Sequence, residues 1–178
     1  MKKFIAIAVL AIVCLTTNAQ CYLGAGIGFG TSKADYDHAQ STTLFQISPE
    51  FGYNFNSKWA IGVDLKFTSV SSGSDYTTFG GDVYGRYTFA HAGCVKFFGE
   101  LALGYAGFGG DKEGSVTSIS LRPGVSANLG KGVNLAGRMN LVDYSMYSKK
   151  AGDCNVTSFG IMNADAIAPF ELALIFDL

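Results

Sequence analysis

The chain has 178 residues, about one domain, with 13 Lys and Arg against 14 Asp and Glu and a formal net charge of −1. This near balance offers no electrostatic attraction for nucleic acid, so we exclude a nucleic-acid-binding role. Hydrophobic residues make up 48% of the chain and charged residues 15%, yet no apolar run reaches the roughly 20 residues of a transmembrane helix.

The segment over residues 1–19 has the layout of a cleaved signal peptide: two lysines, an apolar run and small residues at the cleavage position. We expect cleavage after Ala19, which leaves one domain over residues 20–178. The alternative is a lipoprotein acylated on Cys21, and the bulky Gln20 immediately before that cysteine counts against it.

Eight segments of the mature chain alternate apolar and polar residues, which is the pattern of a strand with two unlike faces. The last segment is the clearest, because Phe170, Leu174 and Phe176 belong to an apolar face that continues to Leu178 with no polar tail. We therefore expect this strand to be paired and to be covered by an apolar surface such as a bilayer. The eight predicted strands cover residues 23–29, 45–55, 59–68, 79–89, 95–105, 118–129, 133–141 and 168–178.

Short and long connections take turns between these strands. The short connections are 56–58, 90–94 and 130–132, and the longer ones, which are rich in Ser, Asp, Lys and Gly, are 31–42, 70–77, 109–115 and 145–167. Short periplasmic turns and longer outer loops are typical of β-barrels in the outer membrane, whereas a soluble sandwich has no reason to alternate its connection lengths.

Aromatic residues on the apolar faces gather near both ends of the predicted strands. The set near the short turns is Tyr53, Phe55, Trp59, Tyr87, Phe89, Phe97 and Phe176, and the set near the long loops is Phe45, Phe67, Phe79, Tyr105 and Phe170. Two such aromatic girdles indicate a barrel that crosses a bilayer.

Three features do not fit regular strands. Pro49 and Pro123 lie inside predicted strands, and we expect β-bulges there because proline removes a hydrogen-bond donor from the ladder. Residues 157–167 fit a strand extension, a loop or a plug equally well.

The polar faces carry charges of both signs. These residues are Glu50, Asp64, Lys66, Asp82, Arg86, Lys96, Glu100, Arg122, Arg138 and Glu171. The interior of an eight-stranded barrel has room for side chains but scarcely for a file of water, so we expect these charges to pair across the lumen and plug it. A narrow, switchable pore in which Arg86, Arg122 or Arg138 exchanges carboxylate partners is the alternative.

Other candidates for chemistry are weak. His38 in the first long loop, with Ser74 and Asp75 in the second, are the residue types of a lipid-modifying hydrolase or acyltransferase, but both loops are generally rich in Ser and Asp. Gly24, Gly26, Gly28 and Gly30 recur every second residue with no helix after them, which favours a smooth inner wall over a phosphate-binding loop. We expect no catalytic residue, no cofactor and no metal site.

Three cysteines, Cys21, Cys94 and Cys154, remain after Cys14 leaves with the signal peptide. An odd number leaves at least one thiol unpaired in an oxidising compartment. Only Cys21 and Cys94 are expected at the same end of the barrel, and we predict no disulfide.

Signal peptide, eight alternating strands, unequal connections and two aromatic girdles together give the mature chain a clear resemblance. It resembles the small outer-membrane β-barrels of the OmpX-like and OmpA-transmembrane-domain-like kind. The resemblance implies an eight-stranded antiparallel up-and-down transmembrane β-barrel in a Gram-negative outer membrane, with both termini on the periplasmic side. Such barrels often end in Phe, whereas here Phe176 is followed by Asp177 and Leu178.

For a barrel of this kind the expected partners are outer-membrane lipid, the barrel-insertion machinery through the C-terminal strand, and a possible surface ligand through the outer loops. We expect a structural or adhesion-like role. The alternatives are a narrow porin-like channel, a lipid-modifying enzyme, and a soluble periplasmic β-barrel that binds an apolar ligand.

Overall fold

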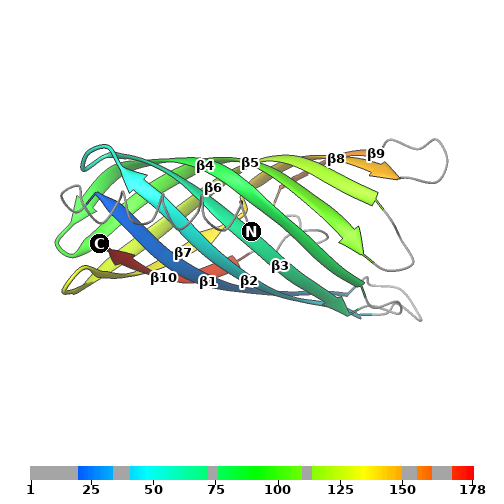
Figure 1. Cartoon of the computed structure of the whole chain (residues 1–178), viewed down its shortest axis with the longest axis horizontal. Helices are drawn as coiled ribbons and strands as arrows, with labels where there is room; N and C mark the ends of the chain where they lie inside the picture. Colours follow the sequence, from blue (N-terminus) through cyan, green and yellow to red (C-terminus); the bar gives the residue numbers. More distant parts are fainter. Residues whose placement is uncertain (1–19, 34–40, 72–75, 110–113, 150–155, 162–169) are drawn as a thin grey trace, which may run out of the picture.

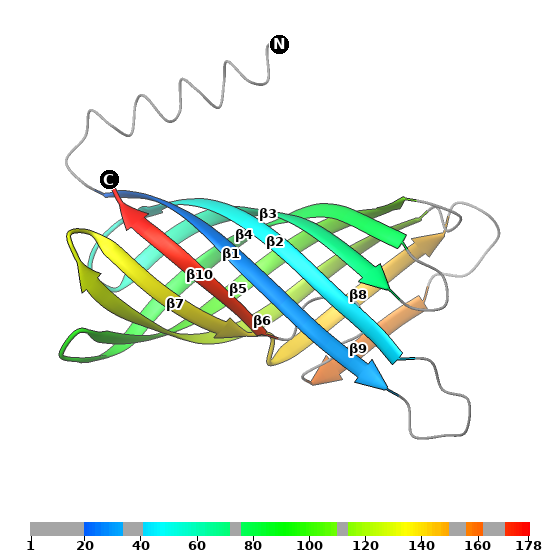
Figure 2. The ribbon, with the colours of Figure 1, turned by 90° about the horizontal axis from the view of Figure 1, so that it is seen from below.

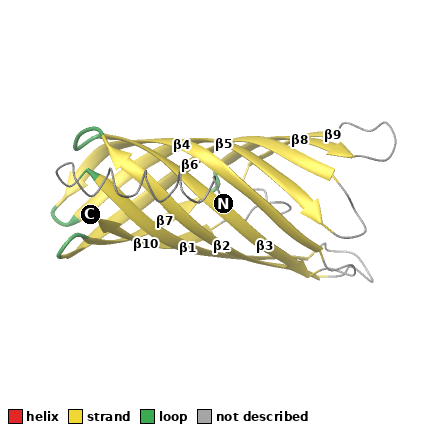
Figure 3. Ribbon diagram, in the orientation of Figure 1, coloured by secondary structure: helices red, strands yellow, loops and turns green. Residues whose placement is uncertain are grey.

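The computed structural model describes residues 20–33, 41–71, 76–109, 114–149, 156–161 and 170–178. All regular structure in these ranges is β-strand (Figure 3). Among the described residues there is no helix with the length and apolar character needed to cross a membrane. The predicted signal peptide lies outside the described residues.

Ten strands form one sheet, and together they make the wall of a barrel (Figure 1). They are β1 (Cys21–Lys33), β2 (Ser41–Asn54), β3 (Trp59–Ser71), β4 (Tyr76–Ala92), β5 (Val95–Gly109), β6 (Gly114–Gly130), β7 (Val133–Met139), β8 (Val142–Lys149), β9 (Val156–Ile161) and β10 (Phe170–Asp177).

The ten strands occupy eight positions around a closed antiparallel ring. Strands β1 to β6 pair in sequence order, and β10 closes the ring by pairing with both β7 and β1 (Figure 2). Strand β6 pairs with β7 near the short turns and with β8 toward the other end, so β7 and β8 are two parts of one wall strand. In the same way β9 lies against β8 and β10 against β7. The predicted eight-stranded barrel is confirmed.

The two faces of each strand separate apolar from polar side chains. Along β3 the outward side chains of Ile61, Val63 and Leu65 are 43–47% exposed, whereas the inward Asp64 and Lys66 are 1% and 7% exposed. An outer surface of this kind is stable only in an apolar surrounding such as a bilayer, where strands have to be paired into a closed ring. A soluble barrel around an apolar ligand requires the opposite arrangement, so that alternative is wrong.

Most of the predicted aromatic residues at the two ends of the barrel lie on the outer face. Near the short turns, Trp59 and Tyr87 stack with ring centroids 4.6 Å apart, and Trp59 is 53% exposed. Toward the other end, Phe67 and Phe79 form a similar pair at 4.8 Å. Tyr53 is half-buried and donates its hydroxyl hydrogen to Gln20.

The strands extend further than their side-chain pattern predicts. Residues 31–33 pair with residues 41–43, inside a stretch expected to be a loop. The expected loop over 145–167 contains the end of β8 and all of β9, so 156–161 is a strand extension, while 162–167 lies outside the described residues. Backbone pairing therefore continues past the point where the apolar alternation of the sequence stops.

The two prolines behave differently. The expected bulge at Pro49 is wrong: β2 keeps one register with β3 on both sides of Ser48 and Pro49, and only their pairings with β3 are missing. Near Pro123 there is an irregularity, as expected. The partner of β6 changes there from β7 to β8, and the pairing register between β6 and its partner shifts by one residue across Asn140 and Leu141. That extra residue lies in the partner strand and not in β6.

Candidate functional site: the charged lumen

The lumen is divided into layers along the barrel axis. Following the inward residues of β4 from its turn end, Thr88 and Arg86 border an open vestibule, Tyr84 and Asp82 lie in the buried charged layer, and Gly80 borders a small outer pocket. Each layer is formed by inward residues from strands on every side of the ring. The stagger between neighbouring strands therefore determines which of these residues lie at the same height along the barrel axis.

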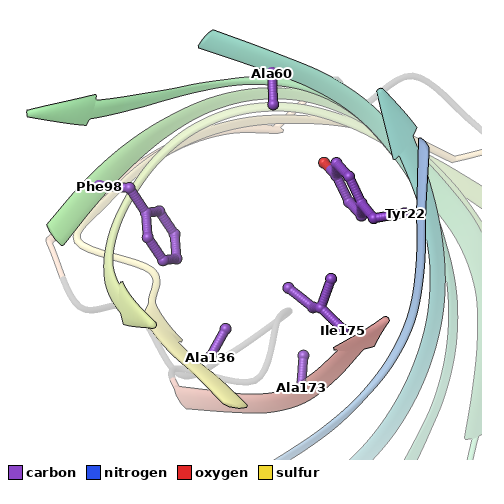
Figure 4. Close-up of a cluster of buried hydrophobic side chains, with 6 residues drawn as sticks. All are labelled: Tyr22, Ala60, Phe98, Ala136, Ala173 and Ile175. Carbon is purple, nitrogen blue, oxygen red and sulfur yellow. The ribbon is translucent and has the colours of Figure 1, made fainter. Parts of the chain in front are cut away.

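An apolar collar lies between the vestibule and most of the charged layer. Its members come from five strands and point into the barrel (Figure 4): Tyr22, Ala60, Phe98, Ala136, Ala173 and Ile175. Three large side chains pack with three alanines, and all six are at most 6% exposed. We did not predict this collar from the sequence, because we treated the inward parity as uniformly polar. The available signal was the presence of Tyr22, Phe98 and Ile175 on that parity near the turns.

Arg138 on β7 links three carboxylates in the charged layer. Its guanidinium lies 2.9 Å from Glu50 Oε2, 2.5 Å from Glu171 Oε1 and 3.4 Å from Glu100 Oε1. Glu50 also accepts a hydrogen bond of 2.8 Å from the Tyr84 hydroxyl. Because β7 and β2 are separated by β10 and β1 in the ring, the contact between Arg138 and Glu50 crosses the lumen.

Arg122 on β6 forms a second group of ion pairs. Its Nη1 lies 3.0 Å from Asp82 Oδ2 and 3.3 Å from Asp64 Oδ2, and its Nε lies 3.2 Å from Glu100 Oε2. The Lys66 ammonium also pairs with Asp82. Arg122 therefore connects β6 with β3, β4 and β5, and the same carboxylate of Asp82 serves two cations.

Arg86 joins the charged layer to the collar. Its Nη2 and Nε lie 2.7 and 2.8 Å from Glu100 Oε1, and its guanidinium carbon lies 4.6 Å from the centre of the Phe98 ring and 5.5 Å from that of Tyr22. Arginine on an aromatic face gains a cation–π contact that is stronger away from water. Glu100, which has no exposed surface, thus contacts Arg86, Arg122 and Arg138 and is the centre of the network.

All nine residues of the predicted lumen network lie inside the barrel, and each forms an ion pair with at least one other member. They are Glu50, Asp64, Lys66, Asp82, Arg86, Glu100, Arg122, Arg138 and Glu171. Lys96 stands apart from them, partly exposed at the turn end. Asp143, which is 6% exposed in β8 and accepts a hydrogen bond from Ser145, was not predicted as a lumen residue, because the last strand residue predicted before the long connection was Leu141.

Inward glycines provide the space for these long side chains. A Cβ on Gly24 would lie 2.7 Å from Glu50 Oε1, and one on Gly26 would lie 2.6 Å from Ser48 Oγ. Beneath the tyrosines, a Cβ on Gly62 would lie 2.5 Å from Tyr84 Cζ. The alternate glycines of β1 leave room for bulky charged neighbours as well as forming a smooth wall.

The other residues singled out in the sequence are four residues of the predicted loops and two cysteines near the turn end. His38, Ser74, Asp75 and Cys154 lie outside the described residues. Within the described part of the chain, Cys21 is buried at the start of β1, Cys94 is exposed in a turn, and the two are not bonded to each other. No group of three or more His, Cys, Asp or Glu suited to a metal ion occurs in the ranges that the structure describes.

Comparison with known proteins agrees with this architecture. The family model described as an outer membrane protein β-barrel domain matches residues 5–163. Among solved structures the chain is similar to Neisserial surface protein A, with a TM-score of 0.52 and 14% identity over 90% of this chain and 98% of the other. It is also similar to the outer membrane protein OprG from Pseudomonas aeruginosa, with a TM-score of 0.49 and 15% identity over 90% and 97% of the two chains. At 14% identity the likeness to Neisserial surface protein A is one of fold alone. No curated protein matches the chain in sequence.

Proposed function

Because this chain belongs to the outer membrane protein β-barrel domain family, we propose that it is a closed barrel with a structural or adhesion-like role in the outer membrane. The observation that carries this proposal is the ion-pair network centred on Glu100, which extends from β2 and β3 on one side of the lumen to β6 and β7 on the other. With its lumen filled, such a barrel acts through its outer face and its loops.

The closure follows from the energetics of buried ion pairs. An ion that enters this layer must separate Arg138 or Arg122 from carboxylates that have little access to water. Removing one partner from a buried pair costs about 3–5 kcal/mol, because the other charge is left uncompensated.

The proposed role at the cell surface rests on which strand ends the longer connections join. The pairs Lys33 and Ser41, Val70 and Tyr76, and Phe108 and Gly114 are neighbours at strand ends opposite the short turns. Loops carried on a rigid scaffold are where binding surfaces concentrate. The bilayer lipid contacts the outer face, and we propose that β10, whose alternating apolar face closes the ring, is the strand that the insertion machinery recognises.

One observation favours a second candidate, a narrow switchable pore. Glu100 contacts three arginines, and Arg138 contacts three carboxylates, so a pair that separates has another partner within reach. Exchange among these partners would cost less than breaking an isolated pair. We propose no catalytic activity, and unchanged lipid A in cells that overproduce the protein is the expected result for the enzyme alternative.

Single-channel recording distinguishes the closed barrel from the pore. Purified protein inserted in planar bilayers is expected to show no reproducible unitary current, while the double variant Arg122→Ala/Arg138→Ala is expected to conduct because it removes the side chains that cross the lumen. The variant Lys131→Gln changes a turn lysine outside the network and is the matched control. Each preparation must first show the band shift of a folded barrel on gels run with and without boiling. Reproducible unitary steps from the unmodified protein would refute the closed-barrel proposal.

A separate experiment tests the adhesion-like role. Cells that display the unmodified protein are compared, for attachment to host-cell monolayers, with cells that display a variant in which residues 34–40 and 110–113 are replaced by short glycine–serine links. Lower attachment by the variant at equal surface amounts is expected. Equal attachment by both would contradict a role for these connections.

A further inference from the structure

A vestibule of about 360 Å³ opens at the end of the barrel that carries the short turns. It is lined mainly by the last inward residues of the strands, together with residues of the turn between β2 and β3. Its volume lies in the lower part of the range of small-molecule sites. Four members of the apolar collar, Tyr22, Ala60, Phe98 and Ile175, line the vestibule and form an apolar floor.

The charged residues around the vestibule are unequal in sign. Lys58, Arg86 and Lys96 line it, and Asp177 is the one carboxylate among its described lining residues. Arg86 is compensated by Glu100 from below. Neither Lys58 nor Lys96 forms an ion pair with any residue that the structure describes, and Asp177 accepts a hydrogen bond of 2.9 Å from the Asn134 amide. The vestibule therefore presents two uncompensated ammonium groups.

Neutral hydrogen-bond donors in the lining also favour a negatively charged ligand. The Asn56 side-chain oxygen Oδ1 accepts hydrogen bonds from the backbone N–H groups of Lys58 and Trp59, at 2.8 and 2.9 Å, so its side-chain amide hydrogens are left for another acceptor. The Gln20 side-chain oxygen Oε1 accepts from the Tyr53 hydroxyl, so the side-chain amide hydrogens of Gln20 are also left for another acceptor. Donors and cations over an apolar floor favour an acceptor that carries negative charge, because the floor reduces screening by water.

We propose that this vestibule is a binding site for a small organic anion that carries carboxylate or phosphate groups. Lys58 and Lys96 supply the charge, and the amide groups of Gln20 and Asn56 supply directed hydrogen bonds. The proposal requires the barrel and its open turn end, and it is independent of whether the charged layer conducts ions.

The test uses the full folded protein, labelled with ¹⁵N, in zwitterionic detergent micelles. Succinate represents a free carboxylate, glycerol 3-phosphate represents a lipid headgroup or a free phosphate ester, and succinamide has the size of succinate without its charge. Titration with either anion is expected to shift backbone amide signals of vestibule residues such as Asn54, Thr88 and Ser126, with saturation. The anion that binds more tightly identifies carboxylate or phosphate as the preferred group, and succinamide is expected to cause no saturable shift.

Two variants locate the charge. The double variant Lys58→Gln/Lys96→Gln is expected to weaken binding at least fivefold, whereas Lys131→Gln, which removes a lysine from another turn at the same end, is expected to change it less than twofold. Both must keep the gel shift of a folded barrel. Equal loss in the two variants would show diffuse charge at this end instead of a site, and the absence of saturable shifts with both anions would overturn the proposal directly.

Discussion

Arg138 is the residue whose loss should disturb the barrel most. Replacing it with glutamine removes one guanidinium from Glu50, Glu171 and Glu100 together. The three carboxylates differ in the partners that they keep. Glu100 keeps Arg86 and Arg122, and Glu50 keeps the Tyr84 hydroxyl at 2.8 Å with Arg86 at 3.8 Å.

Glu171 loses its ion pair and keeps a hydrogen bond of 3.1 Å from the Gln46 amide. The variant thus leaves one carboxylate uncompensated and weakens two others. Removing a single partner from a buried pair costs about 3–5 kcal/mol. Since two of the three carboxylates retain a cation, we expect the free energy of unfolding of Arg138→Gln to fall by about 3 kcal/mol, the lower end of that range.

Urea-induced unfolding from lipid vesicles measures this change. Trp59 is the one tryptophan of the chain and is 53% exposed on the outer face, so its fluorescence reports transfer from lipid to water. The double variant Arg138→Gln/Glu171→Gln removes both charges. We expect it to be less destabilised than the sum of the single variants by about 1–3 kcal/mol, because neighbouring members of one network couple.

Two outcomes would refute this reasoning. A loss under about 1 kcal/mol for Arg138→Gln would mean that the lumen solvates these carboxylates and that the network contributes little. Strict additivity in the double variant would mean that Arg138 and Glu171 do not interact in the folded barrel, whatever their separation. Lys131→Gln in a turn should change the unfolding free energy by less than about 0.5 kcal/mol and serves as the control.

The same unfolding assay tests the packing of the lumen and the membrane face. Gly62→Val should destabilise the barrel by about 1–3 kcal/mol because its side chain meets the Tyr84 ring, whereas Gly85→Ala, where a Cβ has nothing within 4 Å, should be nearly neutral; equal effects would contradict the packing argument. Leu101→Arg, on the outer face near the middle of β5, should cost about 2–4 kcal/mol. Leu129→Arg, beside the turn, should cost under about 1 kcal/mol, and a reversed order would show that the bilayer does not cover these strands as argued.

Several features of the fold could be predicted from the sequence alone. The period-2 alternation assigned an inward or outward face to each residue of β3 and β10, because successive side chains of a strand point to opposite sides whatever the strand's partners. If the charged residues face inward and the apolar residues face outward, the strands must form a closed barrel surrounded by lipid. The family match and the ring of strands confirm the outer-membrane barrel.

The partners in the ion pairs of the lumen could not be predicted from the sequence. Arg138 and Glu50 are 88 residues apart, and their contact depends on the tilt and stagger of the whole ring, to which every turn and register shift contributes. The collar of Tyr22, Phe98 and Ile175 arises in the same way, since nothing local assigns them to one level. Alternation depends only on the sequence of each strand and can be predicted from it. The height of a side chain along the lumen depends on the tilt and stagger of the whole closed barrel.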